Sequence, residues 1–179
     1  MYFFIFGAMD NSGSNFSRGR ITPEKALQKS KHFCGYRERS HAEVKQKLYS
    51  LGLFKKEVEA LISRLIEEEY LNDERFALQF ASGKCRIRGW GRNKIRYELR
   101  QKGISELFIS KALKSLDEQE YEGIFNRQAD KKWQALQTEK NIFAKKIKWQ
   151  QFLLQKGFEP ALIRSWSFPE DYKTGAEAE

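Results

Sequence analysis

Three glycines divide the chain into segments of similar length, and the residues around them match position by position. Gly52, Gly103 and Gly157 are 51 and 54 residues apart. At eight and four residues before each glycine, and at one and six residues after it, stand the apolar residues Val44, Leu48, Leu53 and Val58, then Ile95, Leu99, Ile104 and Ile109, then Trp149, Leu153, Phe158 and Ile163. A glycine supplies the left-handed backbone on which many helices end. The pattern therefore predicts three copies of one helical unit.

Helix-start signals recur along the chain, whereas strand signals are nearly absent after Thr22. Thr22 precedes a proline and an acid, which is the pattern of a capped helix start. Ser40 stands three residues before Glu43, the spacing of a capping box, and Asn72 or Asp73 is placed to cap a later helix. We predict an all-α fold in which three tandem three-helix repeats form an elongated, curved array.

The glycine register also sets the expected organisation of the chain. The predicted segments are an amino-terminal arm at 1–20, repeats at 21–70, 71–118 and 119–168, and a polar tail at 169–179. The third repeat is expected to differ, with a longer opening helix at about 119–139 and a short last helix, because terminal units often cap an array.

The amino-acid composition limits the kinds of molecule that the chain is expected to bind. The chain has 33 lysines and arginines against 24 acids, a formal net charge of +9, which favours polyanions such as nucleic acid or an acidic protein surface. Cys34 and Cys85 lie 51 residues apart without CxxC spacing, so a reducing compartment fits best. The apolar run at 1–6 is too short to span a bilayer. We expect a cytoplasmic monomer.

A search for catalytic or metal-binding patterns finds little. His32, Cys34 and His41 lie near one another in the sequence, but no second cluster completes a tetrahedral site. Asp73 and the acids before it occupy positions where helix caps and helix dipoles favour negative charge. No phosphate-binding glycine loop, zinc-protease helix or nucleophile elbow is present. We predict a protein that is not an enzyme and needs no cofactor or metal.

The strongest functional signal is a basic patch between Lys84 and Lys102, where eight cations accompany one acid, Glu98. Arginine suits phosphate or carboxylate partners because its planar fork donates in pairs. The predicted partner- or DNA-binding residues are Lys84, Arg86, Arg88, Arg92, Lys94, Arg96, Arg100 and Lys102, with Lys145 and Lys148 from a second basic region. Arg92, Arg96 and Arg100 have the spacing of one helical stripe, next to Trp90. A solvated helix face is the alternative.

Four stretches resemble the RecX family of bacterial recombination regulators. They read RSHAEVKQKL at 39–48, YLNDERFA at 70–77, GWGRNKIRYELRQKGI at 89–104 and FLLQKGF at 152–158. The two middle stretches are the more specific, and the resemblance covers about 21–168. The chain departs from the family in its aromatic amino-terminal arm, in Val44 where leucine is common, and in Lys156 where arginine is usual.

The resemblance implies a function as well as a fold. Members of the family have three tandem three-helix repeats, bind the RecA recombinase and its filament on single-stranded DNA, and restrain the filament and its ATPase; some also bind DNA. Two alternatives remain open on the residues alone. One is a freestanding nucleic-acid-binding protein without sequence specificity, and the other is a helical nuclease.

Overall fold

The computed structural model describes residues 21–168, and within that range the chain forms nine α-helices and no strand. The helices are α1 (Pro23–Tyr36), α2 (His41–Ser50), α3 (Lys55–Glu67), α4 (Asp73–Arg88), α5 (Arg92–Gln101), α6 (Glu106–Lys114), α7 (Glu118–Ala135), α8 (Ile142–Lys156) and α9 (Pro160–Ser165). The all-α prediction is confirmed. The predicted arm at 1–20 and tail at 169–179 lie outside the described residues.

The helices begin where the sequence signals them. Thr22 caps α1 through its hydroxyl, and Ser40 and Glu43 form a complete capping box at the start of α2. At the start of α4 the sequence left two candidates, and the cap is Asn72, whose side chain accepts a backbone N–H. Asp73 is the first residue of the helix instead.

The repeated glycine register is confirmed in three dimensions. Gly52, Gly103 and Gly157 have φ angles of 84°, 75° and 87°, the left-handed region that glycine adopts without strain. The N–H of the residue after each glycine donates to the carbonyl of the leucine five residues earlier, at 3.4, 3.1 and 3.1 Å. All twelve matching apolar residues are buried, with at most 5% of their surface exposed. The same local pattern therefore ends a helix and contributes buried apolar residues to the core in each of the three units.

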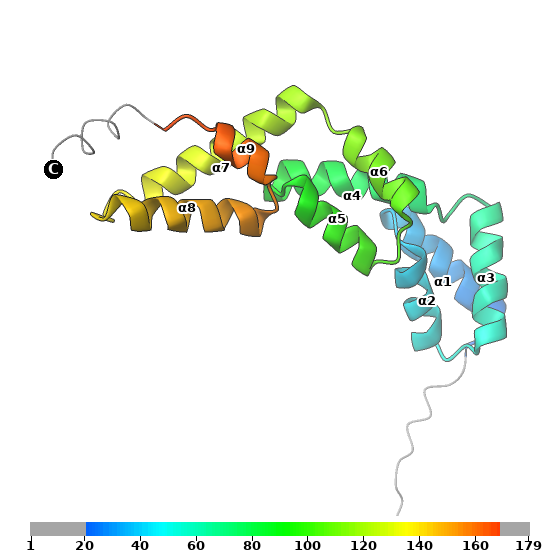
Figure 1. The fold of residues 1–179 in the computed structure, drawn as a ribbon. Coiled ribbons are helices and arrows are strands. Elements are labelled where there is room, and N and C mark those ends of the chain that lie inside the picture. The colour runs from blue at the N-terminus through cyan, green and yellow to red at the C-terminus, as the bar shows by residue number, and fades with distance from the viewer. Residues whose placement is uncertain (1–20, 169–179) are drawn as a thin grey trace, which may run out of the picture.

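The nine helices follow one another as three units along an elongated, curved array (Figure 1). The first unit (α1–α3) lies at one end, the second (α4–α6) in the middle and the third (α7–α9) at the other end. The longest of the described helices, α7, has 18 residues but ends at Ala135, earlier than the expected 139. Residues 136–138 form a turn there that leads to Asn141, the cap of α8.

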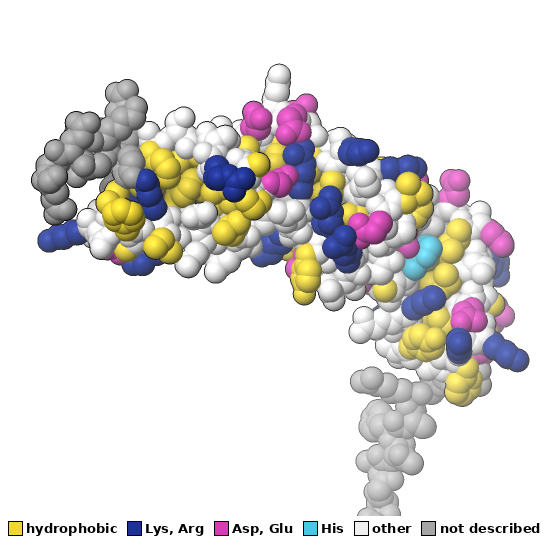
Figure 2. All heavy atoms as spheres, in the orientation of Figure 1, with side chains coloured by type: hydrophobic (Ala, Val, Ile, Leu, Met, Phe, Trp, Pro, Cys, Tyr) yellow, Lys and Arg dark blue, Asp and Glu magenta, His cyan; other side chains and the backbone are white. Residues whose placement is uncertain are grey.

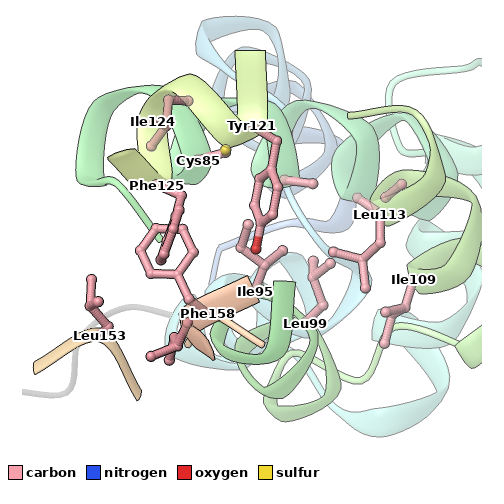
Figure 3. Packing of buried hydrophobic residues seen from close by; sticks show 14 of the residues in the cluster. Cys85, Ile95, Leu99, Ile109, Leu113, Tyr121, Ile124, Phe125, Leu153 and Phe158 are labelled. Atoms are coloured by element: carbon pink, nitrogen blue, oxygen red, sulfur yellow. The ribbon is translucent and has the colours of Figure 1, made fainter. Parts of the chain in front are cut away.

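The hydrophobic core is not divided equally among the units. The first unit has a cluster of its own, whereas the second and third share one continuous cluster. Figure 3 shows Tyr121 and Phe125 of α7 and Phe158 packed among side chains from the second unit, including Ile95. The ring centre of Phe158 lies 5.8 Å from that of Tyr121 and 5.2 Å from that of Phe125. The second and third units therefore form one packed body.

Backbone contact reinforces this shared core. The N–H of Gly91 donates to the carbonyl of Lys156 at 2.8 Å, and the N–H of Asn93 donates to the carbonyl of Gly157 at 3.0 Å. A Cβ atom on Gly91 would lie 2.3 Å from the Gly157 carbonyl, well inside any real contact. Glycine is thus required at Gly91 because the start of α5 touches the end of α8.

The junction between the first and second units is polar. His41 donates its backbone N–H to Asp73 at 3.1 Å, and the imidazole Nδ1 lies 3.2 Å from the same carboxylate. The other two pairs across the junction are Glu38 with Arg75, and Glu43 with Lys102 at 2.8 Å. Burial acts to raise the pKa of Glu43, but the hydrogen bond and charge of Lys102, the backbone N–H of Ser40 and the charge of Arg37 together lower that pKa below its usual range. Electrostatic contacts therefore set the position of the first unit.

Replacing Gly91 with alanine should separate α5 from α8. We expect the G91A variant to lose about 1–3 kcal/mol of unfolding free energy, the usual cost of overpacking a close contact. Urea unfolding followed by circular dichroism measures this. The matched control is Gly83→Ala inside α4, where the new Cβ has nothing within 4 Å and helix propensity favours alanine by about 0.5–1 kcal/mol. Equal stability of the two variants would contradict the contact.

The Glu43–Lys102 pair should make stability depend on pH. Because folding lowers the pKa of Glu43, its contribution is present above the unfolded-state pKa and is lost as pH falls through the folded-state value. In a Lys102→Met variant, the urea midpoint should fall at neutral pH and change less than the wild-type midpoint on acidification. Lys114→Met, at an exposed lysine of α6, is the control that should keep the wild-type pH dependence.

Candidate polyanion interface

The predicted basic residues separate into two groups in the structure. Five of them form ion pairs within the chain: Arg86 with Glu120, Arg92 with Glu118 and Glu159, Arg100 with Glu106, Lys102 with Glu43, and Lys148 with Glu139. Figure 2 shows the consequence on one face, where acidic side chains lie beside basic ones over the middle of the array. Half of the predicted site therefore has an acidic partner already.

Three of these pairs, made by Arg86 and Arg92, join the second unit to the third. Arg86 of α4 uses both arms of its guanidinium to bind the two carboxylate oxygens of Glu120, each at 2.7 Å. Arg92 at the start of α5 binds Glu118 at 2.5 Å and lies over the Tyr121 ring, 4.2 Å from its centre. These carboxylates raise the pKa of both guanidinium groups. Arg86 and Arg92 thus take part in holding α7 against α4 and α5.

A buried hydroxyl completes this joint. The Tyr121 hydroxyl donates to Glu159 Oε2 at 2.6 Å and accepts the backbone N–H of Arg92 at 3.0 Å. Burial, followed by the bond to Glu159, raises the pKa of Tyr121 well above its usual value. The phenol therefore stays protonated and serves as a structural donor.

The other five predicted residues are Lys84, Arg88, Lys94, Arg96 and Lys145, and none has an ion pair with any residue in 21–168. Two of them lie apart from the rest. Lys145 lies over the Trp133 ring, 4.2 Å from its centre. Arg96 follows Lys94 by two residues, so it projects about 200° further around α5.

Lys84 and Lys94 meet around Trp90. The ammonium groups of Lys84 and Lys94 lie 5.0 and 4.9 Å from the Trp90 ring centre, within the range of cation–π attraction. Lys84 also lies 5.2 Å from the centre of Phe80. Trp90, between α4 and α5, therefore gathers cations from both helices.

The third unit continues this arrangement. Lys156 at the end of α8 donates to the carbonyl of Arg88 at 3.1 Å. Lys156 and Lys132 lie over the Phe152 ring, 5.5 and 5.2 Å from its centre. We define the basic-aromatic band as the cations Lys84, Arg88, Lys94, Lys131, Lys132 and Lys156 with the rings of Phe80, Trp90 and Phe152. It crosses the joint between the second and third units.

The band concentrates positive charge without compensation. Burial lowers the pKa of Lys156, and the like charges of Lys94, Lys131 and Arg88 lower it further. No cation of the band has an ion pair within the described part of the chain. Such mutual repulsion is relieved when an anion binds, which makes the band the best candidate for a polyanion interface.

A groove extends from the band toward the first unit. It encloses about 330 Å³, and its lining includes Arg37, Phe80, Lys84, Ile87 and Arg88, together with the acid Glu38. Ile87 is 81% exposed. Aromatic and apolar surface with a cationic rim is the combination that suits single-stranded nucleic acid, whose bases stack while its phosphates bind cations.

Sequence reasoning missed part of this band. Lys131, Lys132 and Phe152 were outside the predicted set, although the run Lys131-Lys132-Trp133 gave a local signal of cations beside an aromatic ring. Lys156 was also outside that set, although the family usually has arginine at this position. The four residues join Lys84 and Lys94 because the end of α8 packs against the start of α5.

The cysteine and histidine candidates for catalysis or metal binding do not come together in one site. Cys34 and Cys85 are free and buried, and burial raises the pKa of both thiols. His41 pairs with Asp73 at the first junction. Across 21–168 no group of three His, Cys, Asp or Glu side chains could hold a metal ion, and no helix there is long and apolar enough to cross a bilayer.

These features define a helical-repeat protein built from tandem three-helix units. Models of the second and third three-helix domains of RecX match residues 72–113 and 119–166. Regulatory protein RecX of Pelodictyon phaeoclathratiforme is 34% identical over 131 residues, which cover 73% of this chain and 79% of that protein. The chain belongs to the RecX family.

Two further comparisons show how much of this chain and of other RecX proteins the similarity covers. Regulatory protein RecX of Prosthecochloris aestuarii is 36% identical over 93 residues, which cover 52% of this chain and only 62% of that protein. The crystal structure of RecX from Lactobacillus salivarius superposes with a TM-score of 0.70 at 24% identity, over 80% of this chain and 92% of that one. That likeness supports the fold of three tandem three-helix repeats.

Neutralising the band should weaken binding to single-stranded DNA more than neutralising a paired cation does. We expect the double variant Lys94→Gln/Lys156→Gln to bind a fluorescent oligothymidine more weakly, as measured by anisotropy. The slope of log affinity against log salt concentration should become less negative by about 0.7 for each phosphate contact that is lost. Arg100→Gln is the control, because Arg100 is paired with Glu106. A larger loss in the control than in the band variant would move the interface to the arginine stripe of α5.

Proposed function

We propose that this protein is a non-enzymatic regulator that binds the RecA recombinase and its filament on single-stranded DNA and restrains recombinase and ATPase activity. The observation that carries the proposal is membership of the RecX family, whose matched relatives are named regulatory protein RecX. On this proposal the protein acts as a monomer in the cytoplasm.

The basic-aromatic band supports a contact with the DNA of such a filament. Its cations come from α4, α5, α7 and α8 and have no acidic partner within residues 21–168. Phosphates attract such cations without regard to sequence. The rings of Trp90 and Phe152 offer surfaces on which bases or sugars pack. A regulator of this kind needs affinity for any single strand rather than for one sequence.

The curved array supports a mechanism of steric restraint. Its length is set by three units in series, and the shared core of the second and third units gives the band a rigid support. A rigid body bound along a filament obstructs the addition or turnover of neighbouring subunits.

A second candidate function is binding to single-stranded nucleic acid without a recombinase. The band and the adjoining groove favour it, because both have the chemistry of such a surface. The two functions differ in salt dependence and partner. Direct phosphate binding predicts a steep fall in affinity for bare DNA as salt rises, whereas filament binding that includes protein contacts predicts tighter and less salt-sensitive binding to RecA-coated DNA.

The decisive measurement is DNA-dependent ATP hydrolysis by RecA from the same organism. Equimolar wild-type protein should lower the steady-state rate, and the K94Q/K156Q variant should lower it less. The R100Q variant should inhibit like the wild type. An unchanged rate and an unchanged filament lifetime with the wild-type protein would refute the regulator function. If the K94Q/K156Q variant inhibits as strongly as the wild type, the regulator function stands, but the interface lies outside the basic-aromatic band.

A further inference from the structure

One side of α4 forms part of the groove between the first and second units. Phe80, Gly83, Lys84 and Ile87 belong to its lining. They stand at i, i+3, i+4 and i+7, so they share one side of the helix over about 10 Å of its length. Ile87 is 81% exposed, and a Cβ atom on Gly83 would have nothing within 4 Å. An open, largely apolar strip therefore runs along α4 inside the groove.

The packing of the fold does not explain the glycine at this place. Gly83 lies inside α4, which continues to Arg88, and a glycine inside a helix is less stable there than alanine. Gly91 and Gly157 let two backbones touch, but no described atom lies against Gly83. The other structural use of a glycine is to let a ligand approach the backbone closely. Gly83 thus points to a ligand lying on α4.

The accessible charge of the groove is positive. Its cations are Lys84 and Arg88 from α4 and Arg37 from the first unit. None of the three forms an ion pair with any residue in 21–168. The acid of the lining is Glu38, but one of its carboxylate oxygens binds Arg75 and the other is buried. The groove therefore presents cations from two units to an anionic ligand.

The size and chemistry of the groove fit one nucleoside of a single strand. Its volume of about 330 Å³ lies near the lower end of the ~300–1,000 Å³ range of small-ligand sites. A partner helix, about 10 Å across, exceeds that volume in a single turn. An unpaired base packs on apolar surface while its phosphates bind cations, so a single strand uses both parts of the lining. Gln79, exposed in the same lining, can donate to one kind of base edge and accept from another.

We propose that this groove is a nucleoside subsite, which takes one unpaired base and its sugar while Arg37, Lys84 and Arg88 bind the neighbouring phosphates. A duplex cannot supply that base without opening a pair. The inference rests on the proposed function, of which contact with single-stranded DNA is part. It adds that the protein recognises unpaired bases as well as phosphates. Because the lining comes from two units, the bound strand also bridges the polar junction between them.

The test compares two fluorescent strands of equal length and charge, oligothymidine and an oligomer that lacks every base. Anisotropy with the full chain should show that oligothymidine binds at least about fivefold more tightly, the low end for one packed base. Gly83→Gln fills the strip, so it should weaken oligothymidine binding about fivefold and leave binding of the abasic strand unchanged. The control Gly35→Gln puts the same side chain at another open helical glycine, outside the groove lining, and should change neither affinity. Ile87→Ser should act like Gly83→Gln and replaces it if circular dichroism shows that the first variant does not fold.

Other results would overturn the proposal. Equal binding of the two strands by the wild type, or an equal loss for both strands in G83Q and I87S, would mean that the groove contacts phosphates alone. Unchanged affinities in both variants would place the groove outside the DNA contact. An oligoglutamate that displaces oligothymidine from the wild type but not from G83Q would assign the groove to an acidic protein segment.

Failure of the subsite is distinguishable from failure of the proposed function. The band variant K94Q/K156Q should weaken binding of both strands, because it removes phosphate contacts that do not involve bases. Inhibition of RecA ATP hydrolysis by the wild-type protein is a separate measurement. If that inhibition is present while G83Q and I87S bind both strands like the wild type, the regulator function stands and the nucleoside subsite is refuted.

Discussion

The contact between the start of α5 and the end of α8 is the constraint on which the rest of this surface depends. Gly91 and Gly157 let two backbones approach until hydrogen bonds form between them. That approach brings Lys156 to the carbonyl of Arg88 and near the charge of Lys94. The basic-aromatic band exists because two glycines allow separate repeats to share one core.

Two arginines of the predicted site hold units of the fold together, while most lysines of the band have no acidic partner. Arg86 and Arg92 bind carboxylates on α7 or beside α9 and so stabilise the joint between two units. Four lysines of the band, Lys84, Lys94, Lys132 and Lys156, lie over aromatic rings and have no carboxylate partner within 21–168. A planar fork suits a fixed internal pair, while a flexible ammonium group suits a phosphate backbone of variable position. Local charge density alone does not separate these roles.

The unequal junctions explain how a chain of similar repeats gains distinct parts. The second and third units pack through apolar side chains and backbone contact, while the first unit attaches through His41, Glu38 and Glu43. Apolar packing resists salt, whereas partly exposed ion pairs weaken with it. The array therefore combines one continuously packed body, which carries the band, with an end unit attached through ion pairs.

The sequence by itself determined the repeated unit, because Gly52, Gly103 and Gly157 and the apolar residues around them act within a few residues of each other. It also located Lys84, Arg88 and Lys94 within a basic segment. Only the tertiary structure decided that Arg92 and Arg100 have acidic partners and that Lys131 and Lys156 join the band. Pairing of charges depends on distances between helices, and helical periodicity carries no information about which helix from another unit lies alongside.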